Sequence, residues 1–359
     1  MKASIFVGVN QPVSVEEVTP IPPGPKDVVV RLGASGVCHS DLSVVNGTLG
    51  FPPPSIIGHE GAGTVEAVGG DVTRVKVGDR VIASFVVTCG TCWFCEHDQP
   101  FVCADTYTAH GTPHATRADG TPLSCVGGLG TMAELMTVSE QVLVPVHTDL
   151  PDEQLALIGC GVTTGVGAAL VTADVQPGST VAVLGCGGVG QSVIQGARIA
   201  GAERIIAIDP TELKRTAAKA MGATDLVDPT GVDPLEAVRE LTGGRGVDYG
   251  FEVVGRPATI QQTIELVRPA GKAVVVGVMG PTEHFEVPGL PFIYSAKEIV
   301  ASFSGSAVPD RDFPRYVRLA EQGELDLASM VSRRYRLDEV NEAIEATAKG
   351  EVLRAMLVL

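Results

Sequence analysis

The stretch Val181-Ala-Val-Leu-Gly185-Cys-Gly187-Gly-Val-Gly190 decides the fold of the second half of the chain. It joins a short apolar run to the spacing G-x-G-x-x-G, and a helix-like segment, 189–200, follows. In this context the first glycine permits a tight turn, the second lets the backbone approach a pyrophosphate, and the third lets helix and strand pack closely. The stretch predicts a dinucleotide site at Gly185, Gly187, Gly188, Val189 and Gly190; the alternative is a glycine turn that serves packing alone.

An acidic residue, Asp209, ends the next expected strand at about the distance that this fingerprint requires. A carboxylate there binds the ribose hydroxyls of adenosine and repels a 2′-phosphate, and no arginine follows it immediately. The sequence therefore favours NAD over NADP. The alternative is an ordinary aspartate at the end of a strand.

From this stretch onward strands alternate with helices, which predicts βαβ units and a parallel sheet. Before about residue 150 the pattern is different, because short β-rich runs such as 27–32, 63–68 and 80–85 lie between Pro/Gly clusters. The last segment holds two helical stretches and a final strand, 354–359. We expect an α/β protein with a β-rich body at 1–161 and 303–359, interrupted by a nucleotide-binding insert at 162–302.

Charge and hydropathy limit the partners and the compartment. The 359 residues include 26 basic and 42 acidic side chains, a formal charge of −16, which argues against a nucleic-acid or anionic-membrane binder. The N-terminus is a poor signal peptide, and apolar runs such as 181–184 are broken well short of the roughly 20 residues of a membrane helix. We expect a cytoplasmic protein, in which clustered cysteines bind metal or do chemistry rather than form disulfides.

Four of the eight cysteines follow one another at C-x2-C-x2-C-x7-C spacing. Four thiolates in one short lobe, 89–103, fit a closed tetrahedral zinc site that stabilises a loop without its own core. The predicted ligands are Cys89, Cys92, Cys95 and Cys103. The alternative is four unrelated buried thiols.

A second set combines residues that are far apart in the sequence. Cys38 lies in Gly36-Val-Cys38-His39-Ser40-Asp41, His59 in Gly58-His59-Glu60-Gly61, and Cys160 between two glycines. Two thiolates and one imidazole leave a zinc ion one open position, which is the catalytic type of site. Each residue alone is ambiguous, since a lone cysteine is usually core and a lone histidine usually has a partner.

With these motifs the chain resembles the zinc-dependent medium-chain alcohol dehydrogenases, in the class III-like or aryl-alcohol-dehydrogenase-like branch, over essentially its whole length. The resemblance implies a GroES-like catalytic domain, a doubly wound Rossmann domain, and two zinc ions and NAD per chain. It assigns the catalytic zinc to Cys38, His59 and Cys160 and the structural zinc to the four clustered cysteines. Cys125 and Cys186 match no ligand position.

The resemblance also gives roles to residues around the ligands. Asp41 matches the carboxylate that orients the histidine ligand, Glu60 an acidic residue that ligates the metal transiently, and Ser40 the hydroxyl that takes the alcohol proton. Ser43 replaces the histidine that ends the proton relay in many relatives, so we expect the proton to leave through water or His39. The family's further cofactor contacts fall on His39, Lys214, Val278 and Arg354.

The resemblance implies reversible hydride transfer between an alcohol and NAD; a primary alcohol is expected, with aryl and allylic alcohols as candidates. A thiol-dependent formaldehyde dehydrogenase on the same scaffold is the first alternative, and a non-catalytic NAD-binding protein is a more distant one. The substrate pocket is expected near Phe85, Trp93, Leu129 or Val278. Relatives are dimers or tetramers, and the apolar segment 287–294 is the expected contact.

Overall fold

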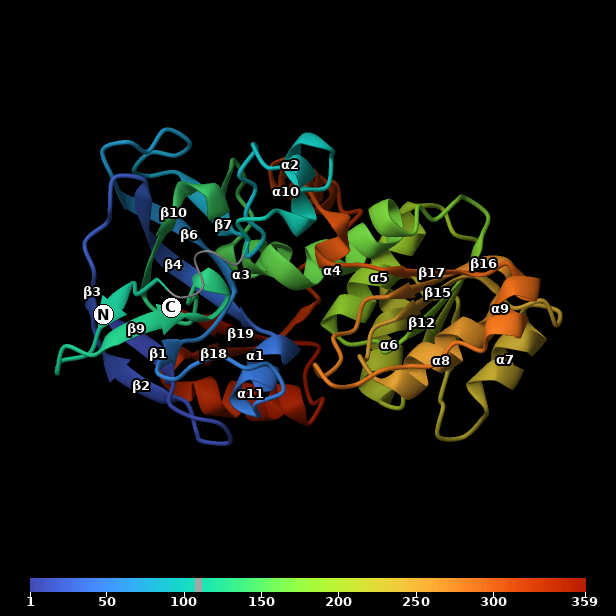
Figure 1. Cartoon of the computed structure of the whole chain (residues 1–359). Helices are drawn as coiled ribbons and strands as arrows, with labels where there is room; N and C mark the ends of the chain where they lie inside the picture. The colour runs from blue at the N-terminus through green and yellow to red at the C-terminus, as the bar shows by residue number, and fades with distance from the viewer. Residues whose placement is uncertain (107–111) are drawn as a thin grey trace. The chain divides into compact units, whose positions relative to one another are not determined.

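The computed structural model describes residues 1–106 and 112–359 (Figure 1). Its contacts divide the chain into two units, Met1–Cys160 with Val308–Leu359, and Gly161–Ala307. The chain therefore leaves the first unit within one residue of the expected boundary and returns five residues later than expected. The later return has a physical cause, because the turn at 304–306 packs on the second unit, where the Ser306 hydroxyl lies 2.8 Å from Thr172 Oγ1.

The first unit is built on two sheets. One has the strand order β2-β1-β5-β9-β8-β3, and the other has the order β11-β7-β6-β4-β19-β18 with β10 paired to β4. The strands are β1 (Lys2–Phe6), β2 (Ser14–Glu17), β3 (Thr19–Pro20), β4 (Asp27–Val37), β5 (Ser55–Ile56), β6 (Glu60–Val68), β7 (Arg80–Ala83), β8 (Ala115–Thr116), β9 (Pro122–Cys125), β10 (Leu135–Ser139), β11 (Leu143–Val146), β18 (Val331–Arg336) and β19 (Arg354–Val358).

The long strand β4 organises this unit, since it pairs with β6, β10 and β19. Its alternating side chains, such as the buried Val28, Val30 and Leu32, fill one apolar core together with residues of β6, β7 and β10. The helices of this unit are α1 (His39–Val45), α2 (Trp93–Glu96), α3 (Asp152–Leu157), α10 (Pro309–Glu321) and α11 (Val340–Ala348).

The second unit is a six-stranded parallel sheet in the order β14-β13-β12-β15-β16-β17. This is the classic doubly wound order with the first strand at the centre. Ala182 and Leu184 of β12 pack towards α7 and α8, and the alternate residue Val183 lies on the α5 side, so helices cover both faces. The strands are β12 (Thr180–Leu184), β13 (Arg204–Ile208), β14 (Asp225–Val227), β15 (Val247–Glu252), β16 (Val267–Val275) and β17 (Glu298–Ala301).

Helix α5 begins within one residue of the predicted helical stretch 189–200, and strands and helices go on alternating through α6, α7 and α8 as the pattern predicts, whereas α4 and α9 were not predicted. The prediction of an α/β fold with a β-rich domain and a parallel-sheet domain is confirmed. The helices are α4 (Thr163–Gly167), α5 (Gly188–Ile199), α6 (Glu212–Met221), α7 (Pro234–Leu241), α8 (Pro257–Leu266) and α9 (Gly289–Ser295).

Besides α2 and α9, two helical segments were not predicted from the sequence. One is α1, which directly follows Cys38, and the other is the helical run Asp152–Thr172, which includes π-helical turns at Ile158–Val162 and Ala168–Thr172. This run has the length and composition to cross a membrane, contrary to the expectation that every apolar run is too short. Its most apolar window is 78% buried inside the protein, as in a core helix of a soluble protein.

Candidate active site

The first turn of α1 fixes two predicted site residues. Cys38 is the N-cap of this helix, and the Asp41 carboxylate reaches back so that Oδ2 accepts the Cys38 main-chain N–H at 2.9 Å. The side chain of Asp41 is completely buried. A carboxylate in the first turn is favoured there because it satisfies an otherwise unpaired amide and the positive end of the helix dipole.

The same carboxylate orients His59. Asp41 Oδ1 lies 3.1 Å from His59 Nδ1, which leaves Nε2 of the buried imidazole available for a metal ion. Asp41 therefore holds two of the three predicted ligand residues at once. It accepts the main-chain N–H of Cys38, and it contacts the ring nitrogen Nδ1 of His59. This is the arrangement that the resemblance implied for Asp41.

Sheet register brings Cys38, Glu60 and Arg354 together. Cys38 follows β4, Glu60 begins β6 and Arg354 begins β19, and β4 pairs with both of these strands. Gly36, opposite Glu60 in the ladder, is required there because a Cβ at this position would lie 2.1 Å from Glu60 Oε2.

Cys160 comes from the π-helical turn Ile158–Val162. The preceding residue, Gly159, allows this turn to approach β7, since a Cβ on it would lie 2.6 Å from the Ala83 carbonyl oxygen. The ligand atoms of Cys38, His59, Glu60 and Cys160 all lie within 4.8 Å of one another, and all four residues are buried. The structure thus assembles the predicted Cys2His set, with Glu60 beside it.

The pKa values of these residues are shifted because several ionisable groups lie close together in a buried site. A hydrogen bond from Cys160 is the main cause that holds the pKa of Cys38 well below its usual range, and the pKa of Cys160 is raised in turn. Burial lowers the pKa of His59, but Asp41 and Cys38 outweigh burial and raise that pKa well above its usual value. Two sulfurs and an imidazole that share protons in this way are a donor set suited to a zinc cation.

Arg354 forms an ion pair with Glu60 in this buried site rather than lying on the surface. The Arg354 guanidinium donates to Glu60 Oε2, and both side chains are almost completely buried. Burial raises the pKa of Glu60 to about 6 against the opposing charge of Arg354. The partnership with Glu60 was missed from the sequence, because the two residues are 294 positions apart and share no motif.

Ser40, the predicted proton acceptor, and Ser43, which replaces the relay histidine of many relatives, both lie on α1. Ser40 Oγ is 3.8 Å from the Cys38 sulfur, and the side chain of Ser40 is half-buried. Ser43 follows three residues later, so both lie on neighbouring positions of one helix face. His39, at the start of α1, is exposed.

The four clustered cysteines lie together in a second group. Their sulfur atoms are all within 4.8 Å of one another, with 3.9 Å between Cys89 and Cys95 and 3.8 Å between Cys92 and Cys103. Four thiolates around one zinc ion at 2.3 Å would be separated by roughly 3.8 Å, the edge of the tetrahedron. The residues therefore fit a closed zinc site.

Main-chain amides support this group. The Cys92 N–H lies 3.3 Å from the Cys89 sulfur. Hydrogen bonds from the main chain at Ala104 and Cys95 lower the pKa of Cys92 to about 6, which favours the thiolate that binds metal. By contrast, desolvation raises the pKa of Cys95 to about 12.

The glycine loop of the second unit joins β12 to α5. Gly185 has a φ of +91°, and a Cβ on Gly190 would lie 1.9 Å from the Gly185 carbonyl oxygen, so both positions require glycine. A Cβ on Gly187 would have no atom within 4 Å, which leaves open space at the position predicted to face a pyrophosphate. Gly188 and Val189 begin α5, whose N-terminal amides favour an anion.

Asp209 follows β13 and is 4% exposed. Its Oδ2 accepts the Cys186 N–H and its Oδ1 accepts the Thr211 N–H, both at 2.8 Å. A carboxylate oxygen can accept more than one hydrogen bond, so ribose binding is compatible with these contacts. Lys214 lies on α6 and is half-buried, whereas Val278 is 66% exposed after β16.

The residues predicted for the substrate pocket separate into different surroundings. The half-buried Phe85 ring lies edge-on to His59, with 6.0 Å between ring centroids. Leu129 is buried in the β4 core, and Trp93 is 60% exposed and stacks on His97. Cys125 and Cys186 are buried and belong to neither candidate metal group of the described residues.

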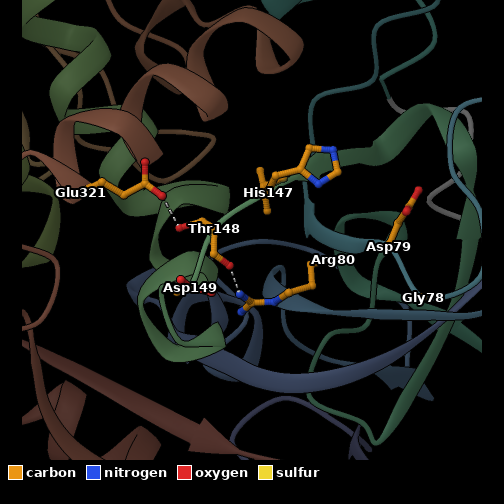
Figure 2. A pocket seen from close by; sticks show the side chains of 8 residues that line it. Gly78, Asp79, Arg80, His147, Thr148, Asp149 and Glu321 are labelled. Atoms are coloured by element: carbon orange, nitrogen blue, oxygen red, sulfur yellow. Dashed lines mark hydrogen bonds between the residues drawn. The ribbon is translucent and has the colours of Figure 1, made fainter.

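A shallow polar cavity elsewhere in the first unit is shown in Figure 2. Arg80 uses its donors within the protein, on the carbonyl oxygens of Thr148 and Leu150 and on the Asp152 carboxylate. Glu321 accepts the Thr148 hydroxyl at 2.6 Å. The charged groups at the centre of this cavity thus tie chain segments together, and we assign it no chemistry.

Comparison with known proteins gives consistent matches over the whole chain. The family described as "Alcohol dehydrogenase GroES-like domain" matches residues 24–148, and the family described as "Zinc-binding dehydrogenase" matches residues 188–322. The S-(hydroxymethyl)glutathione dehydrogenase of Synechocystis sp. (strain ATCC 27184 / PCC 6803 / Kazusa) is 35% identical, and the match covers 99% of each chain.

Two solved structures are similar over the full length. Benzyl alcohol dehydrogenase from Acinetobacter calcoaceticus has a TM-score of 0.93 and 30% identity, covering 100% of this chain and 99% of the other. A zinc-binding dehydrogenase from Sinorhizobium meliloti 1021, bound to NADP, has a TM-score of 0.85 and 27% identity, with the same coverage.

Proposed function

The chain belongs to the zinc-dependent medium-chain alcohol dehydrogenase family, and on that premise we propose that it oxidises primary aryl or allylic alcohols with NAD, reversibly. Members of this family transfer hydride between an alcohol and a nicotinamide nucleotide. The observation that carries the substrate class is the aromatic ring of Phe85 beside the ligand residue His59. When bound, zinc supplies a Lewis acid for the substrate oxygen, and NAD accepts the hydride.

The chain's own residues would divide the work as follows. Cys38, His59 and Cys160 would hold the zinc, with Asp41 fixing the ring and the tautomer of His59. Ser40 Oγ, close to the Cys38 sulfur, would accept the proton of the alcohol, and the proton would then pass to water or to His39. Glu60, paired with Arg354, would be the transient fourth protein ligand.

An apolar ring next to the ligands favours an aromatic or unsaturated substrate, because it buries the substrate's apolar surface while the hydroxyl faces the metal ligands. The 35% identical relative named for S-(hydroxymethyl)glutathione supports the alternative, oxidation of a formaldehyde–thiol adduct. The two differ in whether a thiol is needed for turnover.

The test is a panel of alcohols and aldehydes with NAD(H), with and without glutathione, using the Phe85→Ala variant and Phe94→Ala as the control. Phe94 is an exposed aromatic residue of α2 whose ring contacts Trp93. We expect Phe85→Ala to lower kcat/KM for benzyl alcohol about tenfold and for ethanol much less, from the apolar contact that is lost. Turnover of formaldehyde that requires glutathione, with no turnover of benzyl alcohol, would show the alternative instead.

The preference for NAD would come from Asp209, whose carboxylate repels a 2′-phosphate. Asp209→Asn is the sharpest test, since asparagine keeps an oxygen acceptor for one of the main-chain amides and removes the charge. The ratio of kcat/KM for NADP to that for NAD should rise about tenfold. An unchanged ratio would show that Asp209 does not set the preference.

A homodimer or homotetramer formed through the segment 287–294 is supported by exposure. Among the large hydrophobic side chains of the described residues, the three most exposed all lie on α9: Tyr294 at 82%, Ile293 at 73% and Leu290 at 67%. The neighbouring strand β17 is an edge of the parallel sheet. Ile293→Glu should shift the species seen by light scattering towards monomer, whereas Val77→Glu, on the first unit, should not.

A cytoplasmic location is supported by the cysteines. All eight are free, and six of them lie in the two candidate metal groups. Thiols kept reduced for metal binding suit a reducing compartment. Fractionation of the source cells would test it.

A further inference from the structure

The peptide of Cys186, between the first two glycines of the loop after β12, is fixed by contacts on three sides. Asp209 Oδ2 accepts its N–H at 2.8 Å, and Gln191 Nε2 donates to its carbonyl oxygen at 2.8 Å. The Cys186 side chain is completely buried, with its sulfur 3.7 Å from the Ile208 carbonyl oxygen. The main-chain N–H and the carbonyl oxygen of Cys186, which belong to the two peptide groups that flank this residue, are thus both held by side chains from within the domain.

Gln191 joins two cofactor-binding elements through one amide group. It lies on α5 and is completely buried. Besides the contact with Cys186, its Nε2 donates to the Lys214 carbonyl oxygen of α6 at 2.9 Å. Both donors of the side-chain amide are therefore used, one on the glycine loop and one on the first turn of the next helix.

Packing alone does not require an amide at this position. Gln191 Oε1 is buried and has no hydrogen-bond partner within the part of the chain that the structure describes. An unpaired buried acceptor destabilises the folded protein, and an apolar side chain of similar size would not carry that cost. The amide instead contributes two N–H donors that hold the glycine loop in place.

A loop that is already fixed loses less conformational freedom when a ligand binds, so its affinity for that ligand is higher. We propose that Gln191 is a positioning residue for nucleotide binding, which with Asp209 fixes the Cys186 peptide so that the open side of the loop at Gly187 is ready for a pyrophosphate. The proposal rests on the proposed role of the glycine loop in binding NAD. It separates two tasks: Asp209 both anchors the loop and discriminates at the ribose, while Gln191 only anchors the loop.

The test is the affinity of the full-length, zinc-loaded protein for NADH and NADPH, measured by fluorescence titration for wild type, Gln191→Met and Gln195→Met. Gln195 is a matched control because it is also a fully buried glutamine of α5, one turn further along. Gln191→Met should raise the Kd for both nucleotides about tenfold, leaving their ratio unchanged, because it removes buried hydrogen bonds that hold the loop. Gln195→Met should change neither Kd more than twofold, even if both variants melt at lower temperature.

The proposed role of the glycine loop and the positioning role of Gln191 would be overturned by different results. Wild-type protein that binds neither nucleotide would overturn the proposed role of the loop. Wild-type protein that binds NADH while Gln191→Met binds it within twofold as tightly would overturn the positioning role alone. If Gln191→Met does not fold, Gln191→Asn, whose shorter amide cannot reach the same acceptors, is titrated in its place: a Kd for NADH raised severalfold supports the positioning role, and a Kd within twofold of wild type contradicts it.

Discussion

The two sulfur clusters of this protein differ in how far along the chain they gather their ligands. The closed group takes all four cysteines from residues 89–103, and its sulfurs contact one another and nearby main-chain amides. The open group takes Cys38, His59 and Cys160 from the end of β4, the start of β6 and a π-helical turn. The closed group therefore depends on the residues of one loop, whereas the open group depends on how distant strands pair in the sheet.

The surroundings of the two clusters differ in the same sense. The open group is buried and has Asp41, Glu60 and Arg354 around it. The closed group is partly exposed, and its neighbours Trp93 and Phe94 lie on the surface. Zinc in the closed group would stabilise a loop, while the buried charges of the open group are arranged for chemistry.

The largest expected difference between the clusters is in turnover. Cys38→Ser should lower kcat by at least about a thousandfold, because the metal site that polarises the alcohol is lost. The zinc content should fall from two ions per chain to one while the Tm changes little. Cys125→Ala, at a buried cysteine outside both groups, should keep both zinc ions and full turnover. A Cys38→Ser enzyme that keeps a tenth of the wild-type kcat would contradict the assignment of catalysis to the open group.

Loss of the residue that orients the ligands should have a smaller effect. Asp41→Asn keeps the metal ligands but removes the charge that faces His59, so kcat should fall about 10–100-fold and zinc affinity should weaken. The control is Asp79→Asn, at a half-buried aspartate of the same unit whose Oδ2 accepts the Lys76 main-chain N–H. Equal kcat in Asp41→Asn and wild type would show that Asp41 acts only as a helix cap.

A change in the closed group should affect stability before chemistry. Cys95→Ser should lower the Tm by on the order of 10 °C, because zinc binding contributes directly to folding of the lobe. Trp93, the only tryptophan of the chain, lies between Cys92 and Cys95, so its fluorescence reports the lobe itself. We expect Cys95→Ser to have an altered Trp93 emission spectrum. At low temperature, we expect it to keep most of the wild-type kcat. A kcat loss as large as that of Cys38→Ser would mean that the two clusters are not separate in role.

The smallest expected effect concerns the proton path. Ser43→His places a base one turn beyond Ser40 on α1, and kcat at mildly acidic pH should rise a few-fold if release of the proton limits turnover. The pH profile of kcat for wild type and variant is the measurement. Identical profiles would show that the missing histidine does not limit the reaction.

Local patterns carried most of the fold and one complete cluster. The βαβ alternation after residue 180 predicted the parallel sheet, because strand and helix periods are properties of neighbouring residues. Cysteine spacing predicted the closed group for the same reason, since four thiolates within one short loop can reach one ion without help from other elements. Helix α1 and the run Asp152–Thr172 were missed, because short or fully buried helices lack a clear amphipathic period.

Pairing between distant segments decided the rest. From the sequence, Cys38, His59 and Cys160 could be grouped by ligand chemistry and by resemblance but not placed together by spacing, and the register of β4 against β6 and β19 is what brings Glu60 and Arg354 to Cys38. Likewise the glycine spacing indicated the nucleotide loop, but nothing in it indicated that Gln191 and Asp209 hold the Cys186 peptide. The sequence by itself determined which residues can bind a metal or a nucleotide. Only the tertiary structure decided which buried partners fix them, because hydrogen bonds between residues far apart in the chain leave no periodic trace in it.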